Sequence, residues 1–452
     1  MPRSSGHAAS RSIEVVNLSP TLELTADVLV CGGGVAGTTA AVAAARNGAD
    51  VVLVERYGFL GGNATAGAVA QFNCWQTQAG RRVIAGLAAE VVARLQRIGA
   101  AGQHQTFVMS NGHKMDRVEY SPEVLKLVLD EMVVEAGVRP LLHATLLDVA
   151  CDGRQIEKVH VLTKSGVVAV RPRVVIDATG DIDALKHAGA SFLALGDGES
   201  LQPATLMFRF GPIDFDRFDA VDPAEMARLA KRGFEEGHLA RAALHCARNP
   251  FSRDAWFNIG RLAVDATDAL ALAKAEMEGR RQAWRAALYI KQAVPGCGAG
   301  DLVAFGTQVG VRETRRVEGD HVLTAEDLLE PKEFDDAIAL GAYPIDIHPS
   351  SGGGLTYRMF GDDHAYQIPY RSLIPSAFDN ALSAGRGVSA THTALAAIRV
   401  MTISMAVGQA AGTAAALATR RQDRTNDTRV DVRSVSITAL RQTLERDGAC
   451  LR

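Results

Sequence analysis

Two short apolar runs near the start of the chain flank a helical stretch of small residues. The first run, 28–31, leads into the sequence GGGVAG at 32–37, and the second run, 51–54, ends at Glu55. Alanines fill the stretch between them, and Asn47-Gly48 ends it, because glycine readily adopts the left-handed conformation that follows a helix. The pattern predicts a strand, a helix and a second parallel strand, the βαβ unit that binds dinucleotides. The competing interpretation is a βα turn that is merely rich in glycine.

The glycines of this loop have separate structural uses. Gly32 permits the tight turn after the strand, Gly34 lets backbone N–H groups approach a pyrophosphate, and Gly37 lets the helix pack on the strand. Glu55 lies 21 residues after Gly34, where a carboxylate accepts hydrogen bonds from ribose hydroxyls. The residues expected at the dinucleotide are Gly32, Gly34, Val35, Ala36, Gly37 and Glu55.

A second glycine cluster follows at once, in the sequence RYGFLGGNAT at 56–65. Backbone that wraps a longer, extended cofactor needs such glycines, because they allow close approach. NAD-binding units usually proceed straight into their next helix instead. The cluster therefore favours FAD over NAD, with cofactor contacts from Arg56, Gly61, Gly62, Asn63 and Thr65.

Two distant segments complete the pattern. An apolar strand at 174–177 ends in the sequence ATGD, and the sequence LSAGRG at 382–387 precedes a long helix of small residues. The second segment brings the chain back to the first domain after a large insertion. Further cofactor contacts are expected from Ala178, Thr179, Gly180, Asp181, Gly385 and Arg386.

Together these segments resemble the FAD-dependent oxidoreductases related in fold to glutathione reductase, and more closely the fumarate reductase/succinate dehydrogenase flavoprotein group. The resemblance covers roughly residues 25–420 and also rests on the sequences VGVRETRRVEGDHVLTAEDL, AYPIDIHPSSGG, YQIPYRSLIP and SATHTALAAIRVMTISMAVGQAAGTAAALA. It implies bound FAD and electron transfer through the isoalloxazine ring. It also implies that Leu146 lies at the adenine end, and that Met401 and Thr402 begin a helix that faces the flavin.

The implied fold class is α/β, a Rossmann-like FAD-binding domain that is split in sequence and carries an inserted α+β substrate domain. The expected ranges are a flexible N-terminal segment (1–24), the FAD-binding domain (25–190 and 376–425), the inserted cap (191–375) and a C-terminal tail (426–452). Helices are expected at 83–98, 121–136, 223–235 and 265–290, and strands at 141–151 and 158–163, joined by the turn Asp152-Gly153.

Flavin chemistry asks the protein to hold the substrate and to move a proton. Arg312 is a candidate because arginine binds carboxylates bidentately, and the alternative is a structural network with Glu313, Glu318 and Asp320. His348 loosely resembles the substrate histidine that precedes a Gly-Gly in fumarate reductases. The alternative for His348 is a hydrogen-bonded turn residue.

His392 and Arg399 precede the long C-terminal helix. In the fumarate reductase pattern a histidine and then an arginine occupy this position, so both are expected at the active site. The alternative is a tight helix–turn–helix in which His392 is a cap. The candidate catalytic residues are therefore His348, His392, Arg312 and Arg399.

Composition limits the remaining function classes. The formal net charge of −3 gives no electrostatic reason to bind nucleic acid. The six cysteines contain no C-x-x-C pair, so neither a metal site nor a disulfide framework is expected. The polar N-terminus lacks the apolar core of a secretory signal, and the apolar stretch 401–418 is expected as a buried helix rather than a membrane span. A cytoplasmic protein is expected.

The sequence thus predicts an enzyme that transfers hydride between flavin N5 and a small polar organic substrate, a carboxylate or an oxygenated ring. No histidine occurs at 56–60, where covalently flavinylated relatives carry one, so the FAD is expected to be non-covalent. No second G-x-G-x-x-G unit is present, which favours a dehydrogenase or oxidase with a separate electron acceptor. The alternatives are an electron-transfer subunit of a larger complex and a non-redox isomerase or lyase. A homo-oligomer remains open.

Overall fold

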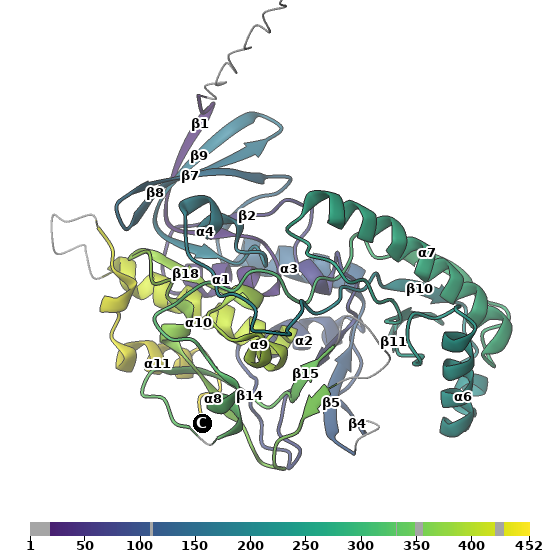
Figure 1. Ribbon diagram of the computed structural model, residues 1–452. Coiled ribbons are helices and arrows are strands. Elements are labelled where there is room, and N and C mark those ends of the chain that lie inside the picture. The colour runs from purple at the N-terminus through teal and green to yellow at the C-terminus, as the bar shows by residue number, and fades with distance from the viewer. Residues whose placement is uncertain (1–18, 109–111, 331, 349–355, 421–428) are drawn as a thin grey trace, which may run out of the picture.

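The computed structural model describes residues 19–108, 112–330, 332–348, 356–420 and 429–452. Its largest sheet has the strand order β6-β2-β1-β9-β8-β7, and β18 also pairs with β9 (Figure 1). The strands β1, β2, β6, β9 and β18 run parallel, whereas β7 and β8 form an antiparallel hairpin. The bounds of these strands are β1 Leu22–Cys31, β2 Val51–Val54, β6 Arg139–Leu141, β7 Thr145–Asp152, β8 Gln155–Thr163, β9 Gly166–Asp177 and β18 Ala381–Ser383.

The predicted βαβ unit is present at the centre of this sheet. The strands β1 and β2 pair from Val28 with Val51 to Cys31 with Val54, and the helix α1 (Val35–Arg46) connects them. Both strands are buried on both faces here, as their continuous apolar runs predict for parallel strands. The predicted boundary between the flexible N-terminal segment (1–24) and the FAD-binding domain is wrong. Residues 22–24 pair with β9 and belong to the sheet, not to a flexible lead-in, because Leu22–Leu24 extend the β1 ladder.

The long C-terminal helix α10 (Met401–Arg420) packs directly on α1, and both lie beside the sheet (Figure 1). A side chain at Gly408 would overlap the carbonyl oxygen of Ala36, so the two helix backbones approach closely. The Thr39 hydroxyl donates to the Met405 carbonyl at 2.9 Å. By length and composition α10 is apolar enough to cross a membrane, but 83% of that window is buried inside the protein.

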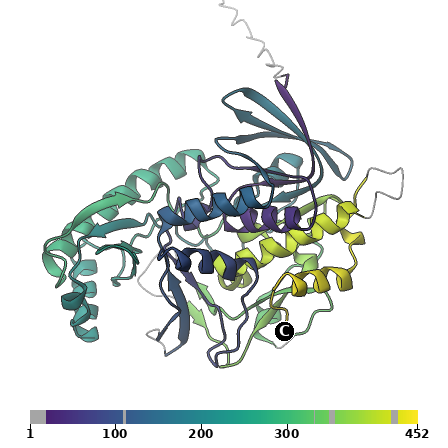
Figure 2. The same ribbon diagram turned by 180° about the vertical axis from the view of Figure 1, so that it is seen from behind.

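A second body of the chain forms the side of the molecule opposite α11 (Figures 1 and 2). Its sheet has the order β11-β12-β10-β13, and its own apolar core contains Phe208, Phe257 and Ile290. The expected helices at 223–235 and 265–290 are confirmed within it. Its elements are β10 Phe208–Gly211, α5 Phe215–Asp219, α6 Pro223–Glu235, β11 Cys246–Arg248, β12 Ala255–Phe257, α7 Ala269–Ala293 and β13 Asp301–Phe305.

The rest of the range 191–375 packs elsewhere. The buried apolar residues in the described parts of the range 323–374 share one apolar core with α1 and α10, so these parts lie with the FAD-binding half rather than with the second body. Their elements are α8 Ala325–Leu329, β14 Ala337–Gly341, β15 Ile345–Ile347, β16 Thr356–Arg358, β17 Tyr366–Pro369 and the turn η2 Tyr370–Leu373.

The remaining elements complete the FAD-binding half. The strand order β3-β5-β4 forms a small sheet beside α2 and α3, and Pro122 opens α3 as its sequence predicts. The bounds are η1 Gly62–Ala64, β3 Gln71–Asn73, α2 Leu87–Arg97, β4 Gln105–Val108, β5 Lys114–Glu119, α3 Pro122–Glu135, α4 Asp183–Ala188, η3 Gly385–Gly387, α9 His392–Ile398, η5 Val432–Ser434 and α11 Ile437–Arg446.

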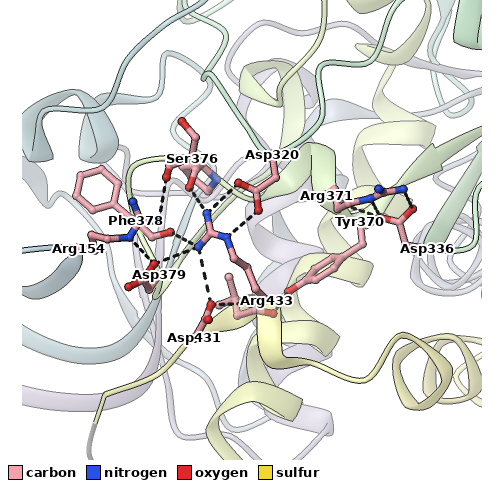
Figure 3. Close-up of polar contacts among 12 residues, drawn as sticks. Arg154, Asp320, Asp336, Tyr370, Arg371, Ser376, Phe378, Asp379, Asp431 and Arg433 are labelled. Carbon is pink, nitrogen blue, oxygen red and sulfur yellow. Dashed lines mark hydrogen bonds and ion pairs between the residues drawn. The ribbon is translucent and has the colours of Figure 1, made fainter.

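Ion pairs attach the C-terminal residues to the body of the protein (Figure 3). Arg433 donates to the Asp320 carboxylate at 2.7 and 2.9 Å and to the carbonyl of Phe378 at 2.9 Å. Asp379 in turn accepts from Arg154 of the β7–β8 turn at 2.7 Å. Leu440 and Leu444 are buried, so residues 429–452 form a packed part of the fold.

Candidate active site

The glycine loop between β1 and α1 requires glycine at two positions. Gly32 has a φ of +95°, and a side chain there would overlap the backbone of Ala178. A side chain at Gly37 would overlap the carbonyl oxygen of Gly32. The loop, the start of α1 and the end of β9 are therefore packed backbone against backbone.

Gly34 differs from its neighbours, because a side chain there would make only an ordinary van der Waals contact. The heavy atom nearest to the position that a Cβ would take is the Cα of Gly62, at 3.9 Å. Gly34 is bridged to Gly61, whose N–H donates to the carbonyl of Gly33 at 2.7 Å. No side chain caps the first turn of α1. The two glycine clusters thus lie together in front of a helix N-terminus, and this space fits a pyrophosphate.

Glu55 is fixed at the end of β2, next to the same loop. One carboxylate oxygen accepts the Gly33 N–H at 2.7 Å and the other accepts the Tyr57 N–H at 2.9 Å. Each oxygen retains a lone pair for a second donor. Ala144 donates its N–H to the carbonyl of Glu55 at 2.9 Å. The start of β7, which contains Leu146, therefore lies next to the end of β2.

The ATGD segment after β9 meets the returning chain. The Asp181 carboxylate accepts from Arg386 and from the Thr314 hydroxyl, each at 2.6 Å. Burial favours the neutral acid, but Arg386 and Thr314 hold the pKa of Asp181 below its ordinary value. Arg386 also lies against Gly180, and its Nε has no hydrogen-bond partner among the described residues. The Asp181–Arg386 pair therefore joins β9 to the segment after β18.

Asp177, at the end of β9, is fully buried and organises this turn. Its carboxylate accepts from the Thr179 N–H and hydroxyl at 3.0 and 2.8 Å and from the Leu185 N–H at 2.9 Å. Burial raises the pKa of Asp177 to about 6. Gly385 lies beside α1, since a side chain there would contact the Ala36 Cβ at 3.4 Å.

The other residues that were expected to contact the cofactor form the following hydrogen bonds within the protein. Arg56 and the Tyr57 hydroxyl both bind Gln308. Asn63 donates to the Val311 carbonyl at 2.9 Å, and Thr65 to the Leu60 carbonyl at 2.6 Å. Thr402, in the first turn of α10 after Met401, donates to the Asn73 carbonyl at 2.6 Å. The structure thus brings the predicted glycine loops together at the start of α1, whereas Thr402 contacts the end of β3.

A second group of polar side chains surrounds Asp346 on β15. One oxygen of its carboxylate, Oδ2, accepts from the Tyr343 hydroxyl at 3.0 Å and lies 3.1 Å from His348 Nε2. Burial opposes ionisation, but the contact with His348 and the charge of Arg399 keep the pKa of Asp346 below its ordinary value. Burial and the charge of Arg312 lower the pKa of His348 to about 4. His348 is therefore a neutral imidazole at pH 7.

Gln202 connects His348 with Arg399. Its side-chain carbonyl oxygen accepts from Arg399 Nη2 at 3.0 Å and from the His348 N–H at 3.4 Å. Arg399 Nη2 also donates to the backbone carbonyl of Asp346 at 3.2 Å. Three of the four candidate catalytic residues, His348, Arg312 and Arg399, are thus neighbours of one carboxylate.

Arg312 donates to the Thr205 hydroxyl at 2.9 Å and to the Pro203 carbonyl. Burial and the nearby charge of Arg399 lower its pKa, although it stays a cation at neutral pH. None of its hydrogen bonds to the described residues goes to an acidic side chain, so the alternative of a network with Glu313, Glu318 and Asp320 is wrong for Arg312. Arg316 pairs with Glu313, and Arg433 with Asp320.

His392 stands apart from this group and pairs with Glu313. Their closest approach, from Nδ1 to Oε2, is 2.8 Å. The N-cap of α9 is Thr391, whose hydroxyl accepts from the Ala394 N–H. The alternative interpretation of His392 as a cap is therefore wrong. Gln202 links the two groups, because its backbone N–H donates to Glu313 Oε2 at 3.2 Å.

Sequence reasoning assigned no role to Gln202, Tyr343 or Asp346, and treated Glu313 only as a partner for arginine. The sequence IDIH placed Asp346 two residues from His348, and this spacing was the one available signal. The glycines at 352–353, which supported the resemblance around His348, lie outside the described residues. Within the described ranges, no group of three or more His, Cys, Asp or Glu side chains is placed to hold a metal ion.

Comparison with known proteins gives one family and several distant structures. A family model described as FAD dependent oxidoreductase matches residues 27–444. A geranylgeranyl bacteriochlorophyll reductase-like protein from Thermoplasma acidophilum is 13% identical, with a TM-score of 0.46 over 94% of this chain and 85% of that one. The p-nitrophenol 4-monooxygenase of Pseudomonas putida is 12% identical, with a TM-score of 0.46 over 93% and 84%. The L-proline dehydrogenase of P. horikoshii is 11% identical, with a TM-score of 0.46 over 86% and 93%. The comparison with curated proteins finds no match.

Proposed function

The chain belongs to the FAD dependent oxidoreductase family, and from this premise we propose that it oxidises a small organic anion at the Asp346 group. The proposal rests on one observation: the side chains around Asp346 carry more positive charges than negative ones. Arg312 and Arg399 are two cations beside the carboxylate of Asp346, Arg241 also acts on Arg312 as a positive charge, and His348 is neutral. Positive charges outnumber negative ones among these side chains in a buried region, and a substrate carboxylate supplies negative charge.

The cofactor site is expected at the glycine loops. The residues proposed to hold FAD are the N–H groups at the start of α1 for the pyrophosphate, Glu55 for ribose hydroxyls, and Gly61 and Gly62 along the chain of the cofactor. When bound, FAD supplies a two-electron acceptor at flavin N5. Non-covalent binding is proposed. The thiol of Cys74, which follows β3, fits this proposal, because burial raises its pKa to about 12 and keeps it protonated and unreactive.

The protein residues have separable roles in this proposal. Arg312 and Arg399 bind and orient the substrate carboxylate. His348 Nε2 faces Asp346, so the two side chains form one pair that exchanges a proton with the substrate. The closer link to the fumarate reductase/succinate dehydrogenase group is part of the proposal, because it rests on the loose similarity around His348.

Anaerobic mixing with candidate substrates tests the proposal. The FAD-loaded protein is expected to lose its flavin absorbance with an organic acid and to keep it with the methyl ester of the same acid. An Arg312→Met variant that carries the same amount of FAD should require a much higher acid concentration. A protein that binds no FAD, or whose flavin is reduced by no small acid, would refute the proposed function. Reduction solely by a protein partner would favour the electron-transfer subunit instead.

A further inference from the structure

The amide of Gln202 is oriented by its neighbours. Arg399 Nη2 and the backbone N–H of His348 are both donors, and both approach the same atom of Gln202. That atom must therefore be the carbonyl oxygen, and the amide nitrogen points the other way. The side chain is 1% exposed, and Nε2 has no hydrogen-bond partner among the described residues. Gln202 thus presents two buried N–H donors that bond to none of the described residues.

Asp346, in contrast, has an acceptor atom to which no described residue donates a hydrogen bond. Its Oδ2 is occupied by Tyr343 and His348, whereas Oδ1 is buried and accepts no hydrogen bond from the described residues. An ionised carboxylate oxygen is a strong acceptor, and a buried one that lacks a donor is unfavourable. The Oδ1 atom of Asp346 can therefore accept a hydrogen bond from one further donor.

These unused atoms belong to side chains in mutual contact. Arg399 Nη2 lies 3.0 Å from Gln202 Oε1, 3.2 Å from the Asp346 carbonyl and 4.0 Å from Asp346 Oδ2. The Nε of Arg399 likewise has no partner in the described part of the chain. A ligand that satisfies all three must bring acceptor atoms to Gln202 and Arg399 and a donor to Asp346.

The geometry points to a 2-hydroxy acid as the substrate, with its carboxylate at Arg399, Arg312 and the Gln202 amide, and its hydroxyl donating to Asp346 Oδ1. This inference deepens the proposed function and rests on it. A 2-amino acid offers the same donor and acceptor positions but carries an ammonium group. That further cation would lie near Arg312 and Arg399, which already repel each other, whereas a neutral hydroxyl brings no such repulsion.

The reaction then balances as follows. The hydroxyl O–H bond and the C–H bond on carbon 2 break, and a carbon–oxygen double bond forms, so that the acid is oxidised to a 2-oxo acid. The hydroxyl proton goes to Asp346 Oδ1, the atom that accepts its hydrogen bond, and the hydride from carbon 2, with its two electrons, reduces the bound FAD. Gln202 is a substrate-binding residue in this scheme, and Asp346 both positions His348 and selects the hydroxyl.

Matched acids that differ only at carbon 2 test the inference. One set is lactate, propionate and alanine, a second is malate, succinate and aspartate, and a third is phenyllactate, phenylpropionate and phenylalanine. Flavin reduction under anaerobic conditions should occur with the hydroxy acid of at least one set and with neither other member. Calorimetric binding of the same acids to Gln202→Met should be at least tenfold weaker than to the wild type, with the FAD content unchanged. The exposed Glu123→Gln variant is the matched control and should bind normally.

The possible failures are distinct. Reduction by succinate or another deoxy acid, or by an amino acid in preference to its hydroxy analogue, would overturn this inference and leave the proposed function standing. Normal acid affinity in Gln202→Met would also overturn it. Absence of FAD, or absence of reduction by every acid, would refute the proposed function and the inference with it. In Asp346→Asn, loss of the preference for hydroxy over deoxy acid, measured as binding, is the supporting result.

Discussion

The carboxylate of Glu313 lies 2.8 Å from Nδ1 of His392, and the two side chains are 0% and 4% exposed. The same carboxylate lies 3.5 Å from Arg316 Nε, which is itself buried. A buried ion pair stabilises a fold only while both charges remain, because loss of one leaves the other without compensation. Glu313 therefore holds the imidazole of His392 in place and also provides a counter-charge for Arg316.

Replacing Glu313 tests this arrangement. In Glu313→Gln the amide keeps the size of the side chain but removes the charge beside Arg316. The free energy of unfolding is expected to fall by about 3–5 kcal/mol, as for other broken buried pairs. Urea denaturation of the variant measures the change. Glu123→Gln removes an exposed carboxylate that pairs with Lys126 and should change the free energy by less than about 1 kcal/mol. Equal effects of the two substitutions would contradict the role of Glu313.

Two glycines of the first loop separate cofactor binding from folding. Gly34→Ala adds a methyl group that meets no atom closer than 3.9 Å, so the melting temperature of the FAD-free protein should stay the same, while the FAD content falls at least about tenfold. Gly37→Ala forces a methyl group onto the Gly32 carbonyl and should lower the stability by about 1–3 kcal/mol. Thermal melting and flavin content of the purified variants distinguish the two effects. Normal FAD binding by a folded Gly34→Ala variant would place the pyrophosphate elsewhere.

We expect Arg312 to contribute to substrate binding and not to the stability of the fold. Arg312→Met removes a buried cation that repels Arg399, so the stability is expected to be unchanged or slightly higher. The KM for an anionic substrate should rise by about 10- to 100-fold, which corresponds to the loss of one charge-assisted hydrogen bond of about 1.5–3 kcal/mol. Steady-state kinetics and urea denaturation of one preparation check both halves. Arg315→Met, which loses an ion pair with Asp183, is the control with normal KM.

The neutral state of His348 makes the fold sensitive to acid. In the unfolded chain its pKa returns to about 6.5, so protonation favours unfolding once the pH falls below that value. The stability contributed by the neutral imidazole is present above about pH 6.5 and is lost progressively as the pH falls toward 4. We expect wild-type stability to decrease between pH 7 and pH 5, and His348→Gln to show a smaller decrease. Denaturant titrations of both proteins at pH 7 and pH 5 measure the free energy of unfolding. Equal decreases in the wild type and in His348→Gln would contradict the neutral state of His348.

The cofactor loops could be predicted because their signals are local. Gly32 and Gly37 are required by backbone contacts within one turn, and such requirements are visible as spacing in a sequence. Gly61 and Gly385 lie beside the same helix, α1, and their contact with the cofactor stays a prediction. The boundary at Leu22 was missed because the polar lead-in hides three residues that continue the β1 ladder.

The Asp346 group could be predicted only in part. His348, Arg312 and Arg399 attracted attention because their side chains carry the chemistry, and the structure makes them neighbours. Gln202 stands between Leu201 and Pro203 with no periodic or motif signal, and its importance depends on which of its amide atoms are already bonded. That information exists only after segments far apart in the chain have come together. The same reason explains why the sequence left open which histidine faces the arginines.

The contact of α10 with α1 has a consequence for biosynthesis. Thr39 is bonded to Met405, a partner 366 residues later, and β18 completes the sheet only after residue 381 has been made. A nascent chain emerging from the ribosome therefore displays its glycine loops on a helix whose apolar side is still uncovered. Contacts of such long sequence separation form slowly, and the half-made protein must be kept from aggregating until its last segment arrives. The packing of α1 is thus complete only after α10 has been translated.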